Sequence, residues 1–386
     1  MEKWKKTTLG AVCESVSITY NNKHNKVVLI NTSDVYDGQI FNHEPVENRN
    51  LKGQFKKTFQ KNDILFSEIR PENKRYAFVD FEDTEHYIAS TKLMVIRPNT
   101  KYILPRFLFS ILTSKAMLQK LQHLAETRSG TFPQITFGAE VSTQGIYLPE
   151  LEEQAKIVSV MNAIALKIRI NNKINDNLYQ QLQAIYRQMF GESAQDDEPE
   201  GHLSDICTYS QRRIDISSLS LESYYSTENM LPGKAGAVAA SSLPSIEKTT
   251  GCKPGDILIS NIRPYFKKIV YSQSECGCST DVLCFVPKEP NLSLFIFSTL
   301  YDDHFFNYMV AGSKGTKMPR GDKQQIMAYP VVLPSAAQLA EFNAVAQPIL
   351  AEIEIGSQEN KRLACMRNAL LPKLMSGEID VSSITL

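Results

Sequence analysis

The chain has 386 residues, enough for two or three domains with cores of their own, and its 42 Lys and Arg residues balance 42 Asp and Glu residues. This balance excludes a general electrostatic attraction to nucleic acid, so DNA binding would have to rest on local basic patches. No apolar run approaches eighteen residues, the charged start lacks the apolar core of a signal peptide, and seven cysteines are too few for a disulfide scaffold, so we expect a cytoplasmic protein with no membrane contact.

Residues 1–147 have the pattern of a mixed α/β domain. Short apolar runs bounded by turn residues predict strands at 27–30, 63–67 and 93–96. An Asp-Gly pair predicts a hairpin turn at 36–39. The apolar spacing over 105–124 predicts a helix, and residues 145–148 are expected to return as a strand.

Residues 148–192 form the longest regular pattern in the chain. Apolar residues recur at alternating steps of four and three, at Ile157, Met161, Ile164, Ile168, Leu178, Leu182, Ile185 and Met189. Such a seam is typical of a coiled coil, and at about 1.5 Å per residue the helix would be roughly 60 Å long. The polar seam residues Asn171 and Asn175 are of the type that fixes the register between paired helices. The alternative is a long surface helix packed on its own domain.

A second copy of this pattern begins at residue 333, displaced by 185 residues. The displaced seam consists of Phe342, Ala346, Ile349, Ile353, Asn360, Leu363, Leu370 and Leu374. Asn360 therefore corresponds to Asn175 and is a further candidate for fixing register. The match is imperfect, because Asn171 falls on Gly356, and Pro348 and Pro372 would kink or end the second helix.

The duplication also covers the domains that precede the two helices. Matching segments keep the same order in both halves: 62–71 with 255–264, 89–91 with 278–280, 106–110 with 294–298, and 129–133 with 314–319. In the second half this predicts strands at 256–260 and 282–286 and a helix near 292–310, whereas residues 217–245 differ from their counterpart. We therefore expect a first domain at 1–147, a first helix at 148–192, an acidic linker at 193–201, a second domain at 202–332, and a second helix with a C-terminal tail at 333–386.

No motif of a catalytic or cofactor site is present in the sequence. Residues 312–317 lack the spacing of a phosphate-binding loop, no Asn/Asp-Pro-Pro-Tyr/Phe tetrad of an amino-methyltransferase occurs, and no Gly-x-Gly-x-x-Gly follows a strand. Cys252, Cys276, Cys278 and Cys284 lack the paired spacing of a zinc site, and the first half has no Cys at the positions that match Cys252, Cys276 or Cys284. We expect ordinary thiols, no metal and no catalytic residue, with a zinc site as the alternative.

Basic loops recur at equivalent places in the two halves. Each half has an Arg-Pro turn after a predicted strand and a Gly-containing loop further on, and Arg or Lys beside Gly suits contact with phosphates or with guanine. The candidate DNA-binding residues are Arg70, Lys74, Arg75, Arg128, Ser129, Thr131, Arg263, Lys267, Lys268, Lys314, Thr316, Lys317 and Arg320. The alternative is that these loops are solvated turns and that the repeated Arg-Pro only ends a strand.

The layout resembles the specificity subunit of type I restriction–modification systems. The resemblance covers nearly the whole chain and is most specific at 63–67, repeated at 256–260, and at 151–157, which is similar to the family's Leu-x-Glu-Gln-x-x-Ile start of the spacer helix. The second copy, at 333–339, lacks the Glu-Gln pair, which leaves the start of the second helix less well defined.

This resemblance implies an α+β protein with two tandem mixed α/β target-recognition domains that alternate with two long helices paired as an antiparallel coiled coil. It implies a non-catalytic subunit that reads a bipartite, asymmetric target on double-stranded DNA and binds two methyltransferase subunits, with restriction–translocase subunits as possible further partners. S-adenosylmethionine, ATP and Mg would be used by the partner subunits, and no cofactor would bind directly to this chain. Two other functions stay open: an enzyme with an unrecognised site, and a coiled-coil scaffold that joins two protein-binding domains.

Overall fold

The computed structural model describes residues 4–21, 24–49, 53–128, 133–191, 201–315, 318–382 and 384. The chain forms two compact units, Met1–Arg169 with Asn360–Leu386 (unit 1) and Ile170–Glu359 (unit 2). Apart from Gly201, the expected linker at 193–201 lies outside the described residues. Among the helices described, none is long and apolar enough to cross a membrane.

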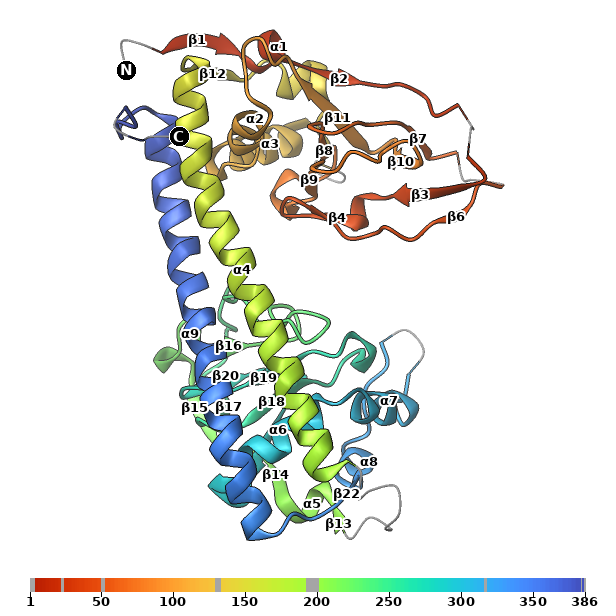
Figure 1. Cartoon of the computed structure of the whole chain (residues 1–386), viewed down its shortest axis with the longest axis vertical. Coiled ribbons are helices and arrows are strands. Elements are labelled where there is room, and N and C mark those ends of the chain that lie inside the picture. The colour runs from red at the N-terminus through yellow and green to blue at the C-terminus, as the bar shows by residue number, and fades with distance from the viewer. Residues whose placement is uncertain are drawn as a thin grey trace. The chain divides into compact units, whose positions relative to one another are not determined.

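Unit 1 is built on two four-stranded sheets, β2-β11-β8-β9 and β6-β3-β10-β7 (Figure 1). Its strands are β1 (Lys5–Thr8), β2 (Cys13–Val16), β3 (Lys26–Ile30), β4 (Val35–Tyr36), β5 (Gln39–Ile40), β6 (Val46–Glu47), β7 (Phe55–Lys57), β8 (Ile64–Ser67), β9 (Tyr76–Phe78), β10 (Tyr87–Ser90), β11 (Leu93–Pro98) and β12 (Gly145–Leu148). Its helices and tight turns are α1 (Leu9–Val12), η1 (Thr32–Asp34), η2 (Pro71–Asn73), α2 (Pro105–Leu112), α3 (Lys115–Arg128) and the π-helix η3 (Phe137–Val141).

The central strand β8 is buried on both faces, which explains its continuous apolar run. Ile64 and Phe66 pack with the helices, in the same core as Phe107, whereas Leu65 packs with residues of the second sheet such as Val28. A strand covered on both faces cannot alternate between apolar and polar residues. The strands predicted at 27–30, 63–67, 93–96 and 145–148 are confirmed as β3, β8, β11 and β12.

Unit 2 repeats the first of these sheets. The order β14-β21-β18-β19 matches β2-β11-β8-β9, and every pairing in both sheets is antiparallel. The second sheet of unit 2, β15-β17-β20-β16, has one parallel pair, as does the sheet β6-β3-β10-β7 of unit 1. The two sheets differ in their added edge strand: β15 pairs with an antiparallel partner of the central strand β20, whereas β6 pairs with β3, the parallel partner of β10. The strands are β13 (Gly201–His202), β14 (Cys207–Tyr209), β15 (Arg213–Asp215), β16 (Tyr224–Tyr225), β17 (Lys248–Cys252), β18 (Ile257–Ser260), β19 (Ile269–Tyr271), β20 (Cys276–Cys278), β21 (Val282–Pro287) and β22 (Pro330–Val331). The helices and turns are α5 (Leu203–Ile206), η4 (Ile216–Ser218), η5 (Pro264–Phe266), η6 (Pro290–Leu292), α6 (Ser293–Tyr301), α7 (Asp303–Ala311) and α8 (Lys323–Met327).

The single helices predicted at 105–124 and 292–310 are wrong in one respect, because each is a pair of helices. The first pair is broken at Thr113 and Ser114, where the Ser114 hydroxyl accepts a hydrogen bond from the backbone N–H of Met117 at the start of α3. The second is broken at Asp302, whose carboxylate accepts from the backbone N–H of His304 at the start of α7. Short polar side chains at these points satisfy free N–H groups and favour a new helix start.

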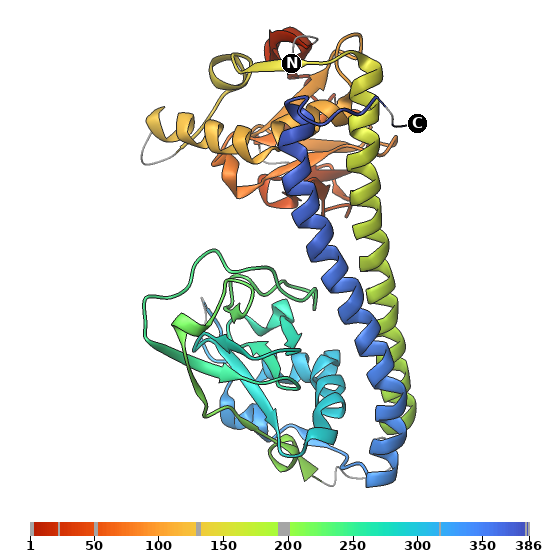
Figure 2. The ribbon, with the colours of Figure 1, turned by 90° about the vertical axis from the view of Figure 1, so that its left-hand side faces the viewer.

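Two 40-residue helices, α4 (Leu151–Phe190) and α9 (Ala336–Met375), supply residues to both units. Within each unit α9 lies alongside α4, as both Figure 1 and Figure 2 show. In unit 2 the contacts are antiparallel, since Asn171 reaches Glu359 whereas Phe190 packs on Phe342. The predicted seam is confirmed, and neither Pro348 nor Pro372 ends the second helix.

Candidate nucleic-acid interface

The Arg-Pro turns of the two units have the same backbone conformation. Arg70 and Lys74 flank η2 with φ of 44° and 55°, and Arg263 and Lys267 flank η5 with φ of 50° and 51°. Left-handed conformations are uncommon for residues with a side chain and cost free energy, so they persist where the surrounding structure imposes them. Because they occur at two equivalent positions in each unit, we infer that the fold imposes the same turn in both halves.

Each turn is joined by its backbone to the Gly-containing loop of the same unit. The N–H of Arg70 donates to the carbonyl of Pro133 at 3.3 Å, and the N–H of Arg263 donates to the carbonyl of Pro319 at 2.8 Å. The structure therefore brings together the two basic loops that the sequence singled out in each half. Of the candidates on the Gly-containing loops, Ser129, Thr131, Thr316 and Lys317 lie outside the described residues.

The lysines that close the turns each form an ion pair with a carboxylate. Lys74 Nζ lies 3.7 Å from the Asp37 carboxylate, and Lys267 Nζ lies 3.1 Å from Asp303. Asp303 also binds Lys234, and these hydrogen bonds from Lys234 and Lys267 hold the pKa of Asp303 below its usual value. These ion pairs therefore offset part of the positive charge that the two lysines could offer to a ligand.

The next residue in each half ties the turn to a neighbouring loop. Arg75 Nη1 donates to the carbonyls of Ser33 and Val35 at 3.1 and 3.4 Å. Lys268 Nζ donates to the carbonyl of Thr227 at 2.5 Å, and burial lowers the pKa of Lys268. Both contacts favour a structural role for these two cations.

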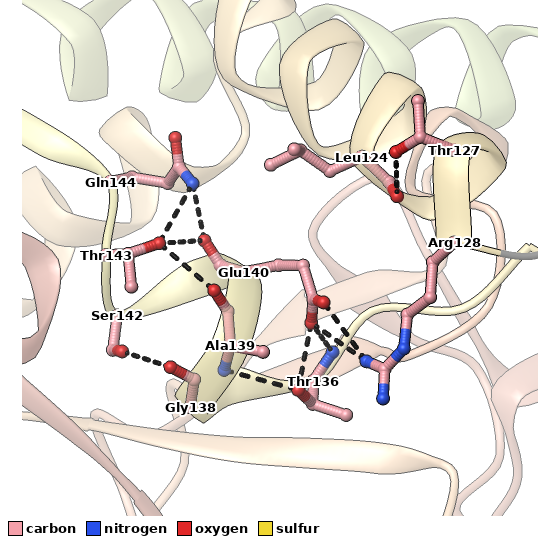
Figure 3. Close-up of polar contacts among 10 residues, drawn as sticks. All are labelled: Leu124, Thr127, Arg128, Thr136, Gly138, Ala139, Glu140, Ser142, Thr143 and Gln144. Atoms are coloured by element: carbon pink, nitrogen blue, oxygen red, sulfur yellow. Dashed lines mark hydrogen bonds and ion pairs between the residues drawn. The ribbon is translucent and has the colours of Figure 1, made fainter.

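Arg128 ends α3 and is held by the π-helix η3 (Figure 3). Its Nη1 lies 3.1 and 3.3 Å from the two carboxylate oxygens of Glu140. Glu140 Oε2 also accepts from the backbone N–H and hydroxyl of Thr136, at 2.6 and 2.9 Å, so this carboxylate closes the start of the π-helix. The Arg128 guanidinium is therefore paired with a carboxylate that has a structural role.

The remaining described cations of the Gly-containing loop in unit 2 are also paired. Lys314 Nζ lies 2.5 Å from Asp322, and Arg320 Nη2 lies 3.0 Å from Asp281. Lys314 and Arg320 also exchange backbone hydrogen bonds at 2.9 Å, which closes the loop at its base. The base of this loop is therefore held by two backbone hydrogen bonds, and its two described cations are both paired with carboxylates.

Arg70 and Arg263 differ from the other described candidates, because neither guanidinium has a carboxylate or backbone carbonyl as a hydrogen-bond partner among the described residues. Arg70 is exposed; Arg263 is half-buried, and its Nε is buried without a hydrogen-bond acceptor. An unpaired arginine at the rim of a fixed turn retains its donors for a ligand such as a phosphate or a base edge. These two equivalent residues are the strongest ligand-binding candidates in the described chain.

Sequence analysis did not predict one feature of the site, a backbone hydrogen bond that supports the end of each turn. The carbonyl of Lys74 accepts from the N–H of Asp37 at 2.9 Å, and the carbonyl of Lys267 accepts from the N–H of Lys234 at 2.9 Å. Asp37 and Lys234 both have positive φ, at 43° and 63°. Lys234 lies in the divergent stretch 217–245, so alignment of the two halves gave no signal for this shared support.

Two polar positions of the helix seam, Asn171 and Asn175, lie between the helices of unit 2, whereas Asn360 belongs to unit 1. Asn175 Nδ2 donates to the carbonyl of Ile353 and to the hydroxyl of Ser357, both at 3.2 Å. Asn171 Nδ2 donates to Glu359 at 2.7 Å, and Asn360 is half-buried on α9. A Cβ at Gly356 would lie 2.7 Å from Asn175 Oδ1, so Gly356, which looked like a mismatch, leaves the space that Asn175 occupies.

Four cysteines of unit 2 are buried in one cluster with a residue of β18. Cys252, Cys276, Cys278 and Cys284 pack with Leu258. The thiol sulfurs of Cys252 and Cys278 are 3.8 Å apart. Within the ranges that the structure describes, no three His, Cys, Asp or Glu side chains are arranged to hold a metal ion.

Comparison with known proteins relates the first part of the chain to one family. Residues 1–180 match the family described as "Type I restriction modification DNA specificity domain". The chain is 42% identical over 191 residues to the type I restriction enzyme HindI specificity subunit of Haemophilus influenzae, a match that covers 49% of this chain and 41% of the relative, so the chain spans about two fifths of that relative's length.

Two solved structures are similar over nearly their whole length. The HsdS subunit from Thermoanaerobacter tengcongensis is 19% identical with a TM-score of 0.43, and 98% of each chain is covered. The type I restriction–modification system S subunit from M. genitalium is 15% identical with a TM-score of 0.48, and 96% of each chain is covered. Residues 1–180 of this chain are therefore similar to the DNA specificity domain of type I restriction–modification systems, and nearly half of the chain is similar to a type I specificity subunit.

Proposed function

We propose that this chain is the non-catalytic DNA-specificity subunit of a type I restriction–modification complex. Each unit reads one half of a bipartite double-stranded DNA target through its Arg-Pro turn and the adjoining Gly-containing loop. Two methyltransferase subunits bind this chain and use S-adenosylmethionine, and restriction–translocase subunits with ATP and Mg²⁺ complete the cutting form. The chain binds no cofactor directly and acts in the cytoplasm.

The observation that carries this proposal is the repetition of one turn whose arginine has no side-chain partner in the part of the chain that the structure describes. Arg70 and Arg263 occupy the same place on the same backbone, each beside a second loop joined to it by a hydrogen bond. Two related reading sites in one chain match a target with two half-sites. The residues at the tips of the turns differ, Glu72 and Asn73 against Tyr265 and Phe266, so the two half-sites should differ in sequence.

The helix pair supports the proposal that the target is bipartite, with a fixed gap between its two half-sites. Residues of both α4 and α9 belong to both units, so the helices can fix the number of base pairs between the half-sites. Asn171 and Asn175 set the register of the pair in unit 2 through hydrogen bonds that a shifted register would break.

A methylome tests the proposal. The chain is expressed with its methyltransferase in a host that lacks adenine methylation, and the DNA is read by sequencing that detects modified bases. A split, asymmetric methylated motif that disappears without this chain is the expected result. A soluble, assembled complex that adds no methylation would overturn the proposal and favour a scaffold, whereas methylation or cleavage by the purified chain alone would show an unrecognised catalytic site.

A further inference from the structure

We propose that Tyr265 and Phe266 form an aromatic wedge that inserts against the bases of one DNA half-site, the one read by unit 2. This inference rests on the proposed function and adds that this half-site is bound with an unstacked base step. The half-site read by unit 1 stays stacked, because the equivalent positions there are polar.

The two rings are exposed at the tip of the turn η5. Tyr265 is 49% exposed and Phe266 is 38% exposed, and their ring centroids are 4.7 Å apart with an interplanar angle of 54°. Burial of a large aromatic side chain stabilises a fold, so two neighbouring rings that stay partly exposed forgo part of this gain. Contiguous exposed apolar surface with a polar rim can mark an interaction site, and these two rings lie side by side among cations.

The backbone beneath the rings is held on both sides. The N–H of Phe266 donates to the carbonyl of Arg263 at 3.0 Å, and the carbonyl of Phe266 accepts from the N–H of Gly233 at 2.8 Å. The adjacent hydrogen bond between Lys234 and Lys267 fixes the end of the turn. A rigid support lowers the entropy cost of inserting a side chain into a ligand.

The charges around the rings favour nucleic acid over an apolar protein surface. Lys234 and Lys267 share one carboxylate, Asp303, which leaves one excess positive charge at the base of the turn. Arg263 is unpaired among the described residues, and Lys268 Nζ lies 5.8 Å from the centroid of the Phe266 ring. Aromatic side chains with a cationic rim bind bases by stacking and phosphates by charge, and apolar side chains that insert between base steps kink the duplex.

The first unit offers a matched contrast on the same backbone. Glu72 and Asn73 stand where Tyr265 and Phe266 stand in unit 2, and both are exposed. The backbone N–H that supports the turn comes from Asp37 in unit 1 and from Lys234 in unit 2. The supporting residue is therefore acidic in unit 1 and basic in unit 2. The proposed wedge therefore belongs to one half-site, where it predicts a flexible pyrimidine–purine step such as TA or CA/TG.

Fluorescence of 2-aminopurine tests this in the assembled complex of the whole chain with its methyltransferase. The probe replaces a base of the methylome-defined motif, other than the methylated adenines, once in each half-site. With the wild-type chain we expect emission to rise several-fold in the unit 2 half-site only. The double variant Tyr265→Ala/Phe266→Ala should abolish this rise and weaken binding roughly tenfold or more, as loss of base stacking does.

Two further variants separate the wedge from other causes. Phe266→Trp keeps a stacking ring and should retain the emission change, and Glu72→Ala/Asn73→Ala should leave the unit 2 signal unaltered. Tight binding by the wild-type complex with no emission change at any position of the unit 2 half-site would overturn the wedge while leaving the proposed function standing. Loss of methyltransferase assembly in the double alanine variant would instead assign the rings to a protein contact, and failure of the wild-type complex to bind any DNA would overturn the proposed function itself.

Discussion

Asp63 accepts two hydrogen bonds from the guanidinium of Arg97, at 2.8 Å from Nε and 2.7 Å from Nη2. Asp63 also accepts from the backbone N–H of Gln60 and is buried at the start of β8. In unit 2 Asp256 makes the same turn by accepting from the N–H of Lys253, but Val286 stands at the position of Arg97. The duplication has therefore kept a buried carboxylate in both halves, but a hydrogen-bonded ion pair at this carboxylate in only one among the described residues; Arg212 and Lys253 attract Asp256 without forming such a pair.

This difference predicts opposite effects of one substitution at the two sites. Asp63→Asn leaves the Arg97 guanidinium without its counter-charge, and we expect a loss of about 3 kcal/mol in the free energy of unfolding, because breaking a largely buried pair strands a charge. Asp256→Asn keeps an acceptor for Lys253 and removes a buried charge, so it should not destabilise. Urea unfolding of both variants measures this, and equal destabilisation would show that Asp256 has a cationic partner in solution.

The pH dependence of Asp256 gives a second prediction. Burial raises the pKa of Asp256, against smaller opposing contributions from the Lys253 amide and the Cys284 thiol. A raised pKa means that the folded state holds the proton more tightly, so the contribution of this group to stability falls as pH rises from about 3.9, the unfolded value, through the folded pKa. Asp256→Asn should therefore be more stable than the wild type at neutral pH, with a difference that vanishes below pH 4.

Thermal unfolding of the two proteins across pH 3.5–8 isolates this group, because other titrations cancel in the difference. A difference that grows as pH falls would mean that the Lys253 hydrogen bond outweighs the cost of burial.

The arginines of the two turns provide the third prediction. Arg70→Ala should weaken binding by about 1–3 kcal/mol and relax specificity in the unit 1 half-site alone, and Arg263→Ala should do the same in the other half-site, if each reads a base. Arg128→Ala is the matched control, since its charge is already paired with Glu140. Methylome sequencing with each variant measures the effect, and uniform weakening on all DNA would assign the arginines to phosphate contacts.

The sequence predicted the strands of the core because their patterns are local. Buried runs such as 63–67 and the 4-3 seam of α4 are set by side chains that share one environment. The helix breaks at Thr113 and Asp302 were missed because a single capping side chain outweighed continuous apolar spacing. Element type thus followed from periodicity, whereas element ends depended on individual hydrogen bonds.

The candidate site was predicted only as a set of loops. Repetition in both halves identified the Arg-Pro turns, and the structure distinguishes among their cations by long-range pairing. Lys267 binds Asp303 and Arg128 binds Glu140, contacts that no local pattern encodes. The support from Lys234 lies in a stretch that differs between the halves, so comparing them could not find it.

The last prediction concerns Gly356 and Asn175 in the helix pair. In an exposed helix, Gly→Ala stabilises by about 1 kcal/mol, because Ala has the higher helix propensity. At Gly356 the new Cβ would lie 2.7 Å from Asn175 Oδ1, and moving that side chain would break its hydrogen bonds to Ile353 and Ser357. Gly356→Ala should therefore destabilise the pair by about 1–3 kcal/mol, the cost of unsatisfied buried polar groups.

A double-mutant cycle measures the coupling between these two positions. Asn175→Ala removes the clash, so Gly356→Ala in that background should recover the ordinary stabilisation of about 1 kcal/mol. Asn175→Leu should instead promote a shifted register or wrong association, because the residue that fixes the alignment is gone. Urea unfolding supplies the free energies and light scattering the assembly state. Equal effects of Gly356→Ala in both backgrounds would show that the two residues are not in contact, and the register would then have to be set elsewhere on the seam.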